Sequence, residues 1–557
     1  MDEHSINVDV AALCGKSGSG KEHCRAWNPP RQQRRPMLNG ASSSFGIRRT
    51  PPGLRTQRPA SPSGSVACCR LATMLALSTL LLLGACATRP INAPIAEFRP
   101  NGGYQYLARQ QYSKNHDNVV ILAFSGGGTR AAAFSYGVLE MLRRTEIVGT
   151  MGITRLIDDV NVITGVSGGS FTALAYALYR DRLFDEYEKR FLKRNVQDEL
   201  IARVLNPAQW GELTSPSWGR SEMAAQLYDE ILFGGATFAD LNRRDGPLVA
   251  VMATDISTGS RVTFDQAFFD VLCSDLGTVP LSRAAAASSA VPVLLSPVNI
   301  NNYGGTCNYR LPEWVGLFPD SATMPRPAAR ASKRLKELQS YGDSVHRPYI
   351  HLVDGAVSDN LGLRGVLDII ETFEALHALG QPTPLDDVRR VVIVVVDSKS
   401  SPETRWDESE NAPGSIRMLI KAAGVQISAY SSDTVELLRD IQARWQALRR
   451  IRDSTAFYPG KDMALKEVLN APNGDLYVVD VSFQALSDKE ELDYLNDLPT
   501  SFALPDMAVD RLRAAAGAIT LASPEFQRLL RDAGAAVVTE PQAANSSTSS
   551  PAANLAH

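Results

Sequence analysis

The chain has 557 residues, of which 44% are hydrophobic and 21% charged, a composition typical of an ordinary globular protein. Its length allows more than one domain, and its formal net charge of −3 gives no indication of nucleic-acid binding. No spacing among its seven cysteines resembles a zinc site, and we expect neither a metal nor another cofactor.

Residues 1–65 are predicted to form a disordered, basic extension. Eight arginines and no acidic residue occur between residues 31 and 70, among Pro, Ser and Gly, and such a stretch cannot bury a core. The extension is either an over-extended gene start, with the real start near Val66, or an arginine-rich targeting sequence; we favour the first. Residues 15–21 fit most of a phosphate-loop pattern, but Glu22 stands where Ser or Thr would bind magnesium, so we expect no nucleotide partner.

Residues 66–85 have the pattern of a lipoprotein signal peptide. The uncharged apolar run over 71–84 is too short to span a bilayer and suits the central region of a signal peptide. It ends in Leu-Gly-Ala-Cys, which resembles the bacterial lipobox, so we expect Cys86 to be lipidated. Ala87 gives no inner-membrane retention signal, which favours the outer membrane of a bacterial cell envelope, facing the periplasm or the exterior. A Pro/Ala-rich tether over 86–116 would follow this anchor.

Residues 117–400 are predicted to form one α/β catalytic domain. Alternating strands and helices indicate a mainly parallel sheet flanked by helices, a three-layer α/β/α fold. Fully apolar runs such as 119–124 and 391–396 suit strands that are covered on both faces. Further strands are expected over 160–166, 248–254 and 349–353, and helices over 131–142, 169–179 and 362–377. A helical segment over 184–233 is expected to form a cap.

A mostly helical C-terminal region is predicted over 401–539, followed by a disordered tail over 540–557. Its expected elements are helices over 433–450, 506–518 and 524–532 and a strand over 476–483. We expect the amphipathic helices to pack against the main domain rather than to contact a membrane. In the processed protein Cys273 and Cys307 either form a disulfide or remain two buried thiols, and the sequence leaves both open.

A candidate nucleophile lies in the segment 164–169, Thr-Gly-Val-Ser-Gly-Gly. Gly165, Ser167 and Gly169 form a Gly-x-Ser-x-Gly pattern between a predicted strand and a predicted helix. This context places the serine on a sharp turn with its hydroxyl accessible. The pattern therefore predicts Ser167 as the nucleophile of an acyl-transfer reaction.

A glycine run, Gly126, Gly127 and Gly128, ends the first predicted strand and opens a helix. Free backbone N–H groups at a helix start can hold an anion, either a phosphate or the oxyanion of a tetrahedral intermediate. The phosphate-loop pattern is absent here, which favours the oxyanion hole. Arg130 is a candidate supporting residue that either stiffens the loop or contacts an anionic head group.

The base that activates the serine is predicted to be a carboxylate. His346 precedes a strand and His351 lies inside it, so neither of these two is well placed for a Ser–His–Asp triad. Three aspartates follow predicted strands, where open α/β sheets carry their sites: Asp255, Asp354 and Asp397. Asp354 differs from the others because Gly355 and a polar turn follow it.

In this order, Gly-Gly-Gly-x-Arg, Gly-x-Ser-x-Gly and Asp-Gly-Ala resemble the motifs of the patatin-like phospholipases, and residues 287–292, Ala-Ser-Ser-Ala-Val-Pro, resemble a further block of that family. The resemblance covers about residues 117–400. It implies a histidine-free dyad with Ser167 as nucleophile and Asp354 as base, the three glycines as oxyanion hole, and no metal. Ala131 departs from the glycine that many members have after the arginine.

We therefore expect a serine acyl hydrolase that cleaves ester bonds of phospholipids or related lipids and is held at a membrane by its anchor. An acyltransferase or thioesterase with the same dyad, or a short-chain esterase, would share this pattern. The alternative from another class is a non-catalytic, membrane-anchored scaffold, whose signature would be the loss of a dyad residue.

Overall fold

A computed structural model describes residues 88–311 and 333–539, apart from gaps at 101, 107–116, 150–151, 214, 216–217, 244, 335, 379–380, 402–405, 412 and 455–471. All described residues belong to one contact unit, residues 71–557. The predicted extension, signal peptide, Cys86 and C-terminal tail lie outside the described residues. Within them, no helix is long and apolar enough to cross a membrane.

The central sheet has the strand order β10-β9-β1-β4-β5-β8-β7, with β6 also paired to β5. Its first five strands are parallel, whereas β8 is antiparallel to β5, and β7 to β8. The bounds are β1 (Asn118–Phe124), β4 (Val160–Val166), β5 (Leu248–Asp255), β6 (Arg261–Phe264), β7 (Val298–Asn301), β8 (Tyr349–Asp354), β9 (Arg390–Asp397) and β10 (Asp475–Ser482). The predicted α/β class with a mostly parallel sheet is confirmed.

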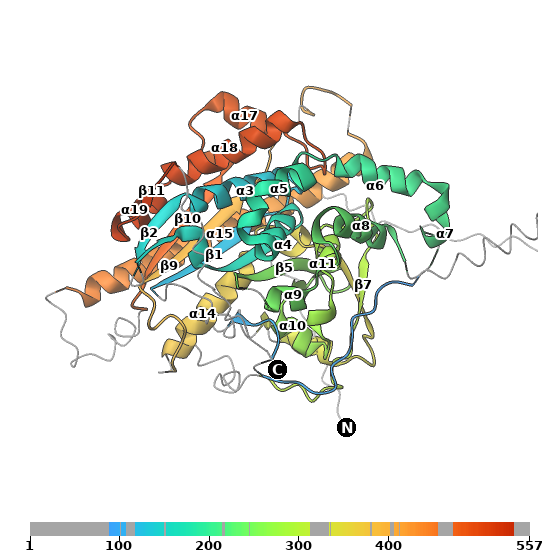
Figure 1. Cartoon of the computed structure of the whole chain (residues 1–557), viewed down its shortest axis with the longest axis horizontal. Helices are drawn as coiled ribbons and strands as arrows, with labels where there is room; N and C mark the ends of the chain where they lie inside the picture. Colours follow the sequence, from blue (N-terminus) through green and yellow to red (C-terminus); the bar gives the residue numbers. More distant parts are fainter. Residues whose placement is uncertain are drawn as a thin grey trace, which may run out of the picture. The chain divides into compact units, whose positions relative to one another are not determined.

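Helices cover both faces of the sheet, as Figure 1 shows. Alternate residues of a strand point to opposite faces, and β9 shows the result: Val392 and Val394 join one hydrophobic core, Val391 and Ile393 the other. The first core is covered by α3 (Gly128–Arg143), α4 (Gly168–Tyr179) and α18 (Asp506–Ala522), the second by α14 (Arg364–Ala378) and α15 (Ser415–Arg452). These are the three layers expected from the sequence.

The predicted cap region is helical. It contains α5 (Leu183–Tyr187), α6 (Val196–Leu205), α7 (Trp210–Leu213) and α8 (Arg220–Tyr228). Phe171 of α4 stacks on Phe191 and meets Tyr228 edge-on, which fixes this region to the core of the sheet domain. Smaller helices are α9 (Phe238–Asn242), α10 (Gln266–Val271), α11 (Leu281–Ser288) and α13 (Ala356–Asp359).

The region after residue 400 is built into the same sheet. Strand β10 pairs with β9 along its whole length. Helix α18 crosses α3 at Gly137, where a Cβ would lie 2.5 Å from the Arg513 carbonyl oxygen, so only glycine allows this approach. The C-terminal helices thus pack against the main domain, as predicted; α17 (Lys489–Asp497) and α19 (Pro524–Asp532) complete the region.

Several elements were not predicted from the sequence. A second, small sheet is formed by β2 (Thr145–Gly149), β3 (Gly152–Arg155) and β11 (Ala536–Val537). Residues 88–98, part of the predicted tether, lie against the domain: Asn92 is buried and exchanges hydrogen bonds with the backbone of Asn301. Cys273 and Cys307 are joined in a disulfide, which resolves the two alternatives left open.

The pairing along β5 explains why β4 and β8, which lie far apart in the chain, end next to each other. Along β5, β4 pairs with residues 248–252, β6 with 251–254 and β8 with 253–255. Because β6 overlaps both β4 and β8, it must occupy the edge of β5 opposite to each of them. Strands β4 and β8 therefore lie end to end on one edge, with Val166 opposite Met252 and Asp354 opposite Ala253.

Candidate active site

Ser167 occupies the sharp turn between β4 and α4 that its sequence pattern predicts. Its φ of 47° is unusual for a residue with a side chain, and its side chain is buried within the site. The flanking glycines permit this turn: a Cβ at Gly165 would lie 2.7 Å from the Ser170 Cα, and one at Gly169 would lie 2.6 Å from the Ser125 carbonyl oxygen. The strained turn holds the hydroxyl at the end of the strand rather than within the helix.

Asp354 accepts a hydrogen bond from the Ser167 hydroxyl, with 2.9 Å between Oγ and Oδ2. The two residues are 187 positions apart in the chain and meet because β4 and β8 end against each other beside β5. The route to this contact differs from the sequence expectation. The sequence places Asp354, like Asp255 and Asp397, after a strand of a mainly parallel sheet, but β8 is antiparallel to its neighbour β5.

The carboxyl group of Asp354 is buried, and burial raises its pKa to about 6, although two hydrogen bonds act in the opposite direction. These bonds come from the Ala356 N–H to Oδ1, at 2.9 Å, and from the Ser167 hydroxyl to Oδ2. The carboxylate is therefore more basic than an exposed aspartate and is still ionised at neutral pH. That combination suits a group that accepts a proton.

The segment that links the two residues is the end of α11 and the turn after it. The Ser288 hydroxyl accepts a hydrogen bond from the Ser167 N–H at 2.8 Å, and the Ser288 carbonyl accepts one from the Gly355 N–H. The Ala290 carbonyl accepts a third from the Asp354 N–H at 3.0 Å. Residues 287–292 thus hold the backbones of Ser167 and Asp354 together, a role that the sequence pattern did not reveal.

The three glycines of the predicted oxyanion hole are not equivalent. Gly126 donates its N–H to the Asn360 carbonyl at 3.0 Å, so this group is not available to an oxyanion. Among the residues that the structure describes, the N–H groups of Gly127 and Gly128 have no acceptor. The loop adjoins the serine closely, since a Cβ at Gly126 would lie 3.3 Å from the Ser167 Cβ.

Arg130 is buried at the start of α3, directly after this loop, and its hydrogen bonds join this point to the C-terminal region. Its guanidinium donates to the carbonyls of Ser398 and Leu498, at 2.8 and 2.6 Å, and to the Thr500 hydroxyl at 3.1 Å. Burial lowers its pKa to about 10, so the arginine remains charged. With these donors directed at the C-terminal region, the side chain is not positioned to meet an anionic head group.

The other candidate bases have different surroundings. Asp255 is fully buried and accepts hydrogen bonds from Arg347, Tyr341 and Thr258, which makes it a structural anchor. Asp397 accepts from the Lys399 N–H, and burial raises its pKa to about 6. The imidazole rings of His346 and His351 bond to Asp343 and Asn299, respectively.

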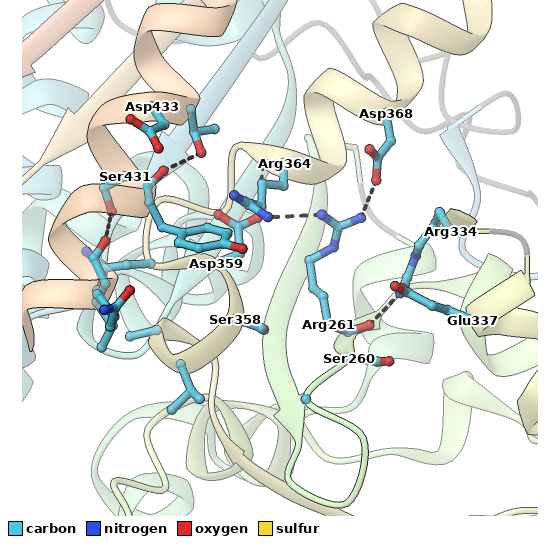
Figure 2. Close-up of a pocket in the computed structure, with 18 of the residues that line it drawn as sticks. Ser260, Arg261, Arg334, Glu337, Ser358, Asp359, Arg364, Asp368, Ser431 and Asp433 are labelled. Carbon is cyan, nitrogen blue, oxygen red and sulfur yellow. Dashed lines mark hydrogen bonds and ion pairs between the residues drawn. The ribbon is translucent and has the colours of Figure 1, made fainter. Parts of the chain in front are cut away.

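A cavity of about 690 Å³ is lined in part by residues 356–360, the segment that follows Asp354, although neither Ser167 nor Asp354 itself lines it. Residues 356–360 and residues 426–437 of α15 contribute to its lining, as Figure 2 shows for Ser358, Asp359 and Ser431. Arg261 also lines it and pairs with Asp368 at 2.6 Å, and the Arg364 guanidinium stands 4.0 Å from the centre of the Tyr430 ring. The volume falls within the range of small-molecule sites, and the charged lining suits a polar ligand.

Within the described part of the chain, no cluster of His, Cys, Asp and Glu has the composition of a metal site. One residue that supports Asp354, Thr254, was missed by sequence reasoning, whereas Ser358 and Asn360 belong to the polar turn that the sequence singled out after Asp354. The Thr254 hydroxyl donates to the Asp354 carbonyl at 2.9 Å and contacts the Ser358 hydroxyl. Asn360 orders the glycine loop. Thr254 has no pattern that marks it in the sequence.

A layered α/β protein with a serine on a strand-to-helix elbow, hydrogen-bonded to a buried carboxylate, has the architecture used by serine hydrolases. Residues 122–367 match the family model described as patatin-like phospholipase. This segment is therefore a domain of the patatin-like phospholipase family, as the sequence resemblance predicted.

Solved structures and curated proteins add little to this assignment. Human GIVD cytosolic phospholipase A2 is 13% identical, with 77% of this chain and 65% of that chain covered and a TM-score of 0.35. VipD from Legionella pneumophila is 11% identical, with 78% and 72% covered and a TM-score of 0.24. The match thus spans less than two thirds of the human enzyme. No curated protein matches the chain.

Proposed function

We propose that the protein is a serine acyl hydrolase that cleaves ester bonds of phospholipids or related lipids. The observation that carries this proposal is the 2.9 Å hydrogen bond from the Ser167 hydroxyl, on its strained elbow, to the buried carboxylate of Asp354. The family of residues 122–367 supports a lipid substrate. We assign the role of nucleophile to Ser167 and the role of base to Asp354.

In the proposed reaction Asp354 accepts the proton of Ser167 while the serine oxygen attacks the ester carbonyl. The N–H groups of Gly127 and Gly128 donate to the oxyanion of the tetrahedral intermediate, and each such donor contributes about 3 kcal/mol to transition-state stability. When the intermediate collapses, protonated Asp354 gives its proton to the leaving alcohol, and an acyl-enzyme remains. Asp354 then deprotonates a water molecule that releases the fatty acid.

The cavity lined by residues 356–360, which follow Asp354 in the chain, supports a substrate with a polar portion. The charged lining of this cavity disfavours an acyl chain, because burying hydrocarbon there would remove water from charged groups without giving them new hydrogen bonds. The same charged groups can bind a polar head group. Hydrolysis of phospholipids is thus expected to exceed hydrolysis of triacylglycerols of the same chain length. Equal rates on both would remove the cavity from the proposal.

A fluorophosphonate probe, which traps an activated serine as an analogue of the tetrahedral intermediate, tests the dyad directly. The full chain is expected to label at Ser167, with no labelling of Ser167→Ala and much slower labelling of Asp354→Asn. Ser135→Ala is the matched control, because Ser135 is another buried serine and lies in α3, away from the elbow. Labelling that persists in Ser167→Ala would refute the assignment of the nucleophile.

A further inference from the structure

The loop between α11 and β7 carries two adjacent apolar side chains that are almost fully in solvent. Val293 is 75% exposed and Leu294 68% exposed. Single exposed apolar residues are ordinary, but a neighbouring pair at a loop tip is a sign of an interaction surface. Val293 also has a φ of 77°, a left-handed conformation that is costly for a β-branched residue and that persists at this outward-facing tip.

This loop is attached directly to the active site. It begins at Ala290, whose carbonyl holds the Asp354 N–H, and three residues span at most about 11 Å to Val293. Arg220 of α8 donates to the Val293 carbonyl and places a cation beside the tip. Val357, three residues after Asp354, is 46% exposed and lines the cavity. Exposed apolar side chains therefore lie within a short chain distance of Asp354 on two segments.

The N-terminal segment approaches this same part of the molecule. Phe98 donates its backbone N–H to the Cys307 carbonyl, Asn92 bonds to Asn301 at the end of β7, and Arg89 reaches back to the Asn299 carbonyl at 3.0 Å. Followed toward its start, the segment thus runs along β7 in the direction of the 291–297 loop, as Figure 1 shows for the blue trace beside β7. Asn299 lies opposite His351, three residues before Asp354.

The sequence upstream of this segment is the most apolar of the chain. The uncharged run over 71–84 and the predicted lipidation site at Cys86 end three residues before Arg89, a span of at most about 11 Å. An anchor at that position would hold the β7 side of the domain, rather than its opposite side, next to the bilayer. The segment over residues 88–98 and the exposed pair Val293 and Leu294 therefore both indicate that the β7 side of the domain would face the bilayer.

We propose that this face, which we call the mouth surface and define by Val293, Leu294 and Arg220, docks on a lipid bilayer. The apolar side chains insert among the acyl chains, and Arg220 contacts anionic lipid head groups. Docking in this orientation brings the loop that holds the Asp354 backbone to the membrane, so that a lipid reaches the dyad without crossing bulk water. The role of the surface in substrate supply rests on the proposed hydrolase function, whereas the docking itself does not.

Tryptophan quenching in vesicles tests the docking on the full chain. The variants are Leu294→Trp and, as a matched control, Val345→Trp; Val345 is 84% exposed but precedes the start of β8, at the end away from Asp354. In vesicles of phosphatidylethanolamine and phosphatidylglycerol that contain brominated lipid, the fluorescence added at residue 294 is expected to be quenched at least twofold and that at residue 345 to be unchanged. Equal quenching, or none at either position, would overturn the proposal.

A second measurement separates docking from chemistry. Val293→Asp with Leu294→Asp is expected to lower hydrolysis of vesicle lipid by tenfold or more, because each apolar group removed from the bilayer weakens binding by about that factor. Hydrolysis of a water-soluble short-chain ester should stay within twofold, and Val345→Asp should change neither rate. If the parent chain fails to cleave the soluble ester, the proposed function fails while the quenching result still decides the docking. Equal losses on both substrates would count against the mouth surface.

Discussion

The parallel and antiparallel parts of the central sheet contribute to the active site in different ways. In the parallel part, the glycine loop and Ser167 follow directly from the ends of β1 and β4, where a strand turns into a helix. In the antiparallel part, Asp354 reaches the serine only because β8 enters from the opposite direction and stops where β4 ends. Local sequence is sufficient for the first arrangement. The second depends on which edge of β5 the two strands share.

The two buried aspartates beside β5 show what this difference means chemically. Asp255 ends a parallel strand, the position where α/β sheets usually carry their sites, yet Arg347, Tyr341 and Thr258 occupy its carboxylate. Asp354 receives only one backbone N–H besides the Ser167 hydroxyl. Surroundings, rather than position at a strand end, therefore separate a structural carboxylate from a candidate base.

Loss of the nucleophile is the strongest test of the site's parallel part, in which Ser167 follows β4. Ser167→Ala is expected to lower kcat/KM for a short-chain ester by about 10⁴-fold or more, because no other group can form the acyl-enzyme. The free energy of unfolding should fall by no more than about 1–3 kcal/mol, since the variant keeps the backbone turn and loses one hydrogen bond to the buried Asp354 carboxylate. Retention of more than a hundredth of the activity in a folded variant would place the nucleophile elsewhere.

The antiparallel part of the sheet is tested by comparing variants of Asp354 and Asp255. Asp354→Asn should lower kcat by about 10³-fold with little change in stability, because the amide keeps the shape but accepts no proton. Asp255→Asn should instead lower the free energy of unfolding by about 3 kcal/mol, since it removes the charged partner of Arg347. Its activity per folded molecule should remain. Steady-state kinetics and denaturant unfolding should be measured on both variants. If Asp255 were the base and Asp354 the structural carboxylate, Asp255→Asn would lose activity and Asp354→Asn would lose stability.

The support of the glycine loop is expected to have an intermediate effect. Arg130→Met would leave the Ser398 and Leu498 carbonyls without their donor in a buried place and let the loop move. We expect kcat/KM to fall about 10- to 100-fold and the free energy of unfolding to fall by about 2–3 kcal/mol. KM should change less than kcat, because the loop acts on the oxyanion and not on the bound ester. A change confined to KM would favour contact with substrate instead.

The raised pKa of Asp354 predicts the pH profile. A base must be ionised, so kcat/KM should fall about tenfold per pH unit below pH 6 and level off above it. Stability has the opposite dependence: the native state holds this proton more tightly than the unfolded state, so its contribution is lost as pH rises from about 4 to 6. Asp354→Asn should remove both effects. A parent profile that stays flat down to pH 4 would contradict the assignment.

The disulfide is expected to have the smallest effect on activity. Cys273→Ser with Cys307→Ser opens a loop with a sequence separation of 34, and chain-entropy arguments give a loss of about 3–4 kcal/mol in unfolding free energy. Neither cysteine contacts Ser167 or Asp354, so kcat/KM at a temperature where the variant is folded should stay within twofold. A larger fall in kcat/KM would show that the segment closed by this disulfide helps to position Asp354.

Much of the fold was predictable because its elements have strong local signals. The apolar runs at β1 and β9 and the helical spacing in α14 and α18 gave segments close to those observed. The short strands β6 and β7 were missed, since a strand of four residues has too few positions to show a period. Helix α15 proved longer than the predicted segment: it begins at Ser415, and the helical spacing of Ile416, Ile420 and Ile427 in its first half was overlooked.

The sequence by itself determined the class of the fold, the elbow that carries Ser167 and the glycine loop, because each rests on residues that are neighbours in the chain. The family resemblance implied the pairing of Asp354 with Ser167, but only the tertiary structure shows how the two meet. It alone decided that Ser288 and Ala290 hold the two backbones, that Gly126 is already bonded and that Arg130 is held by Ser398, Leu498 and Thr500. These contacts join segments far apart in sequence. Their partners are selected by strand pairing and burial, and no local pattern encodes that choice.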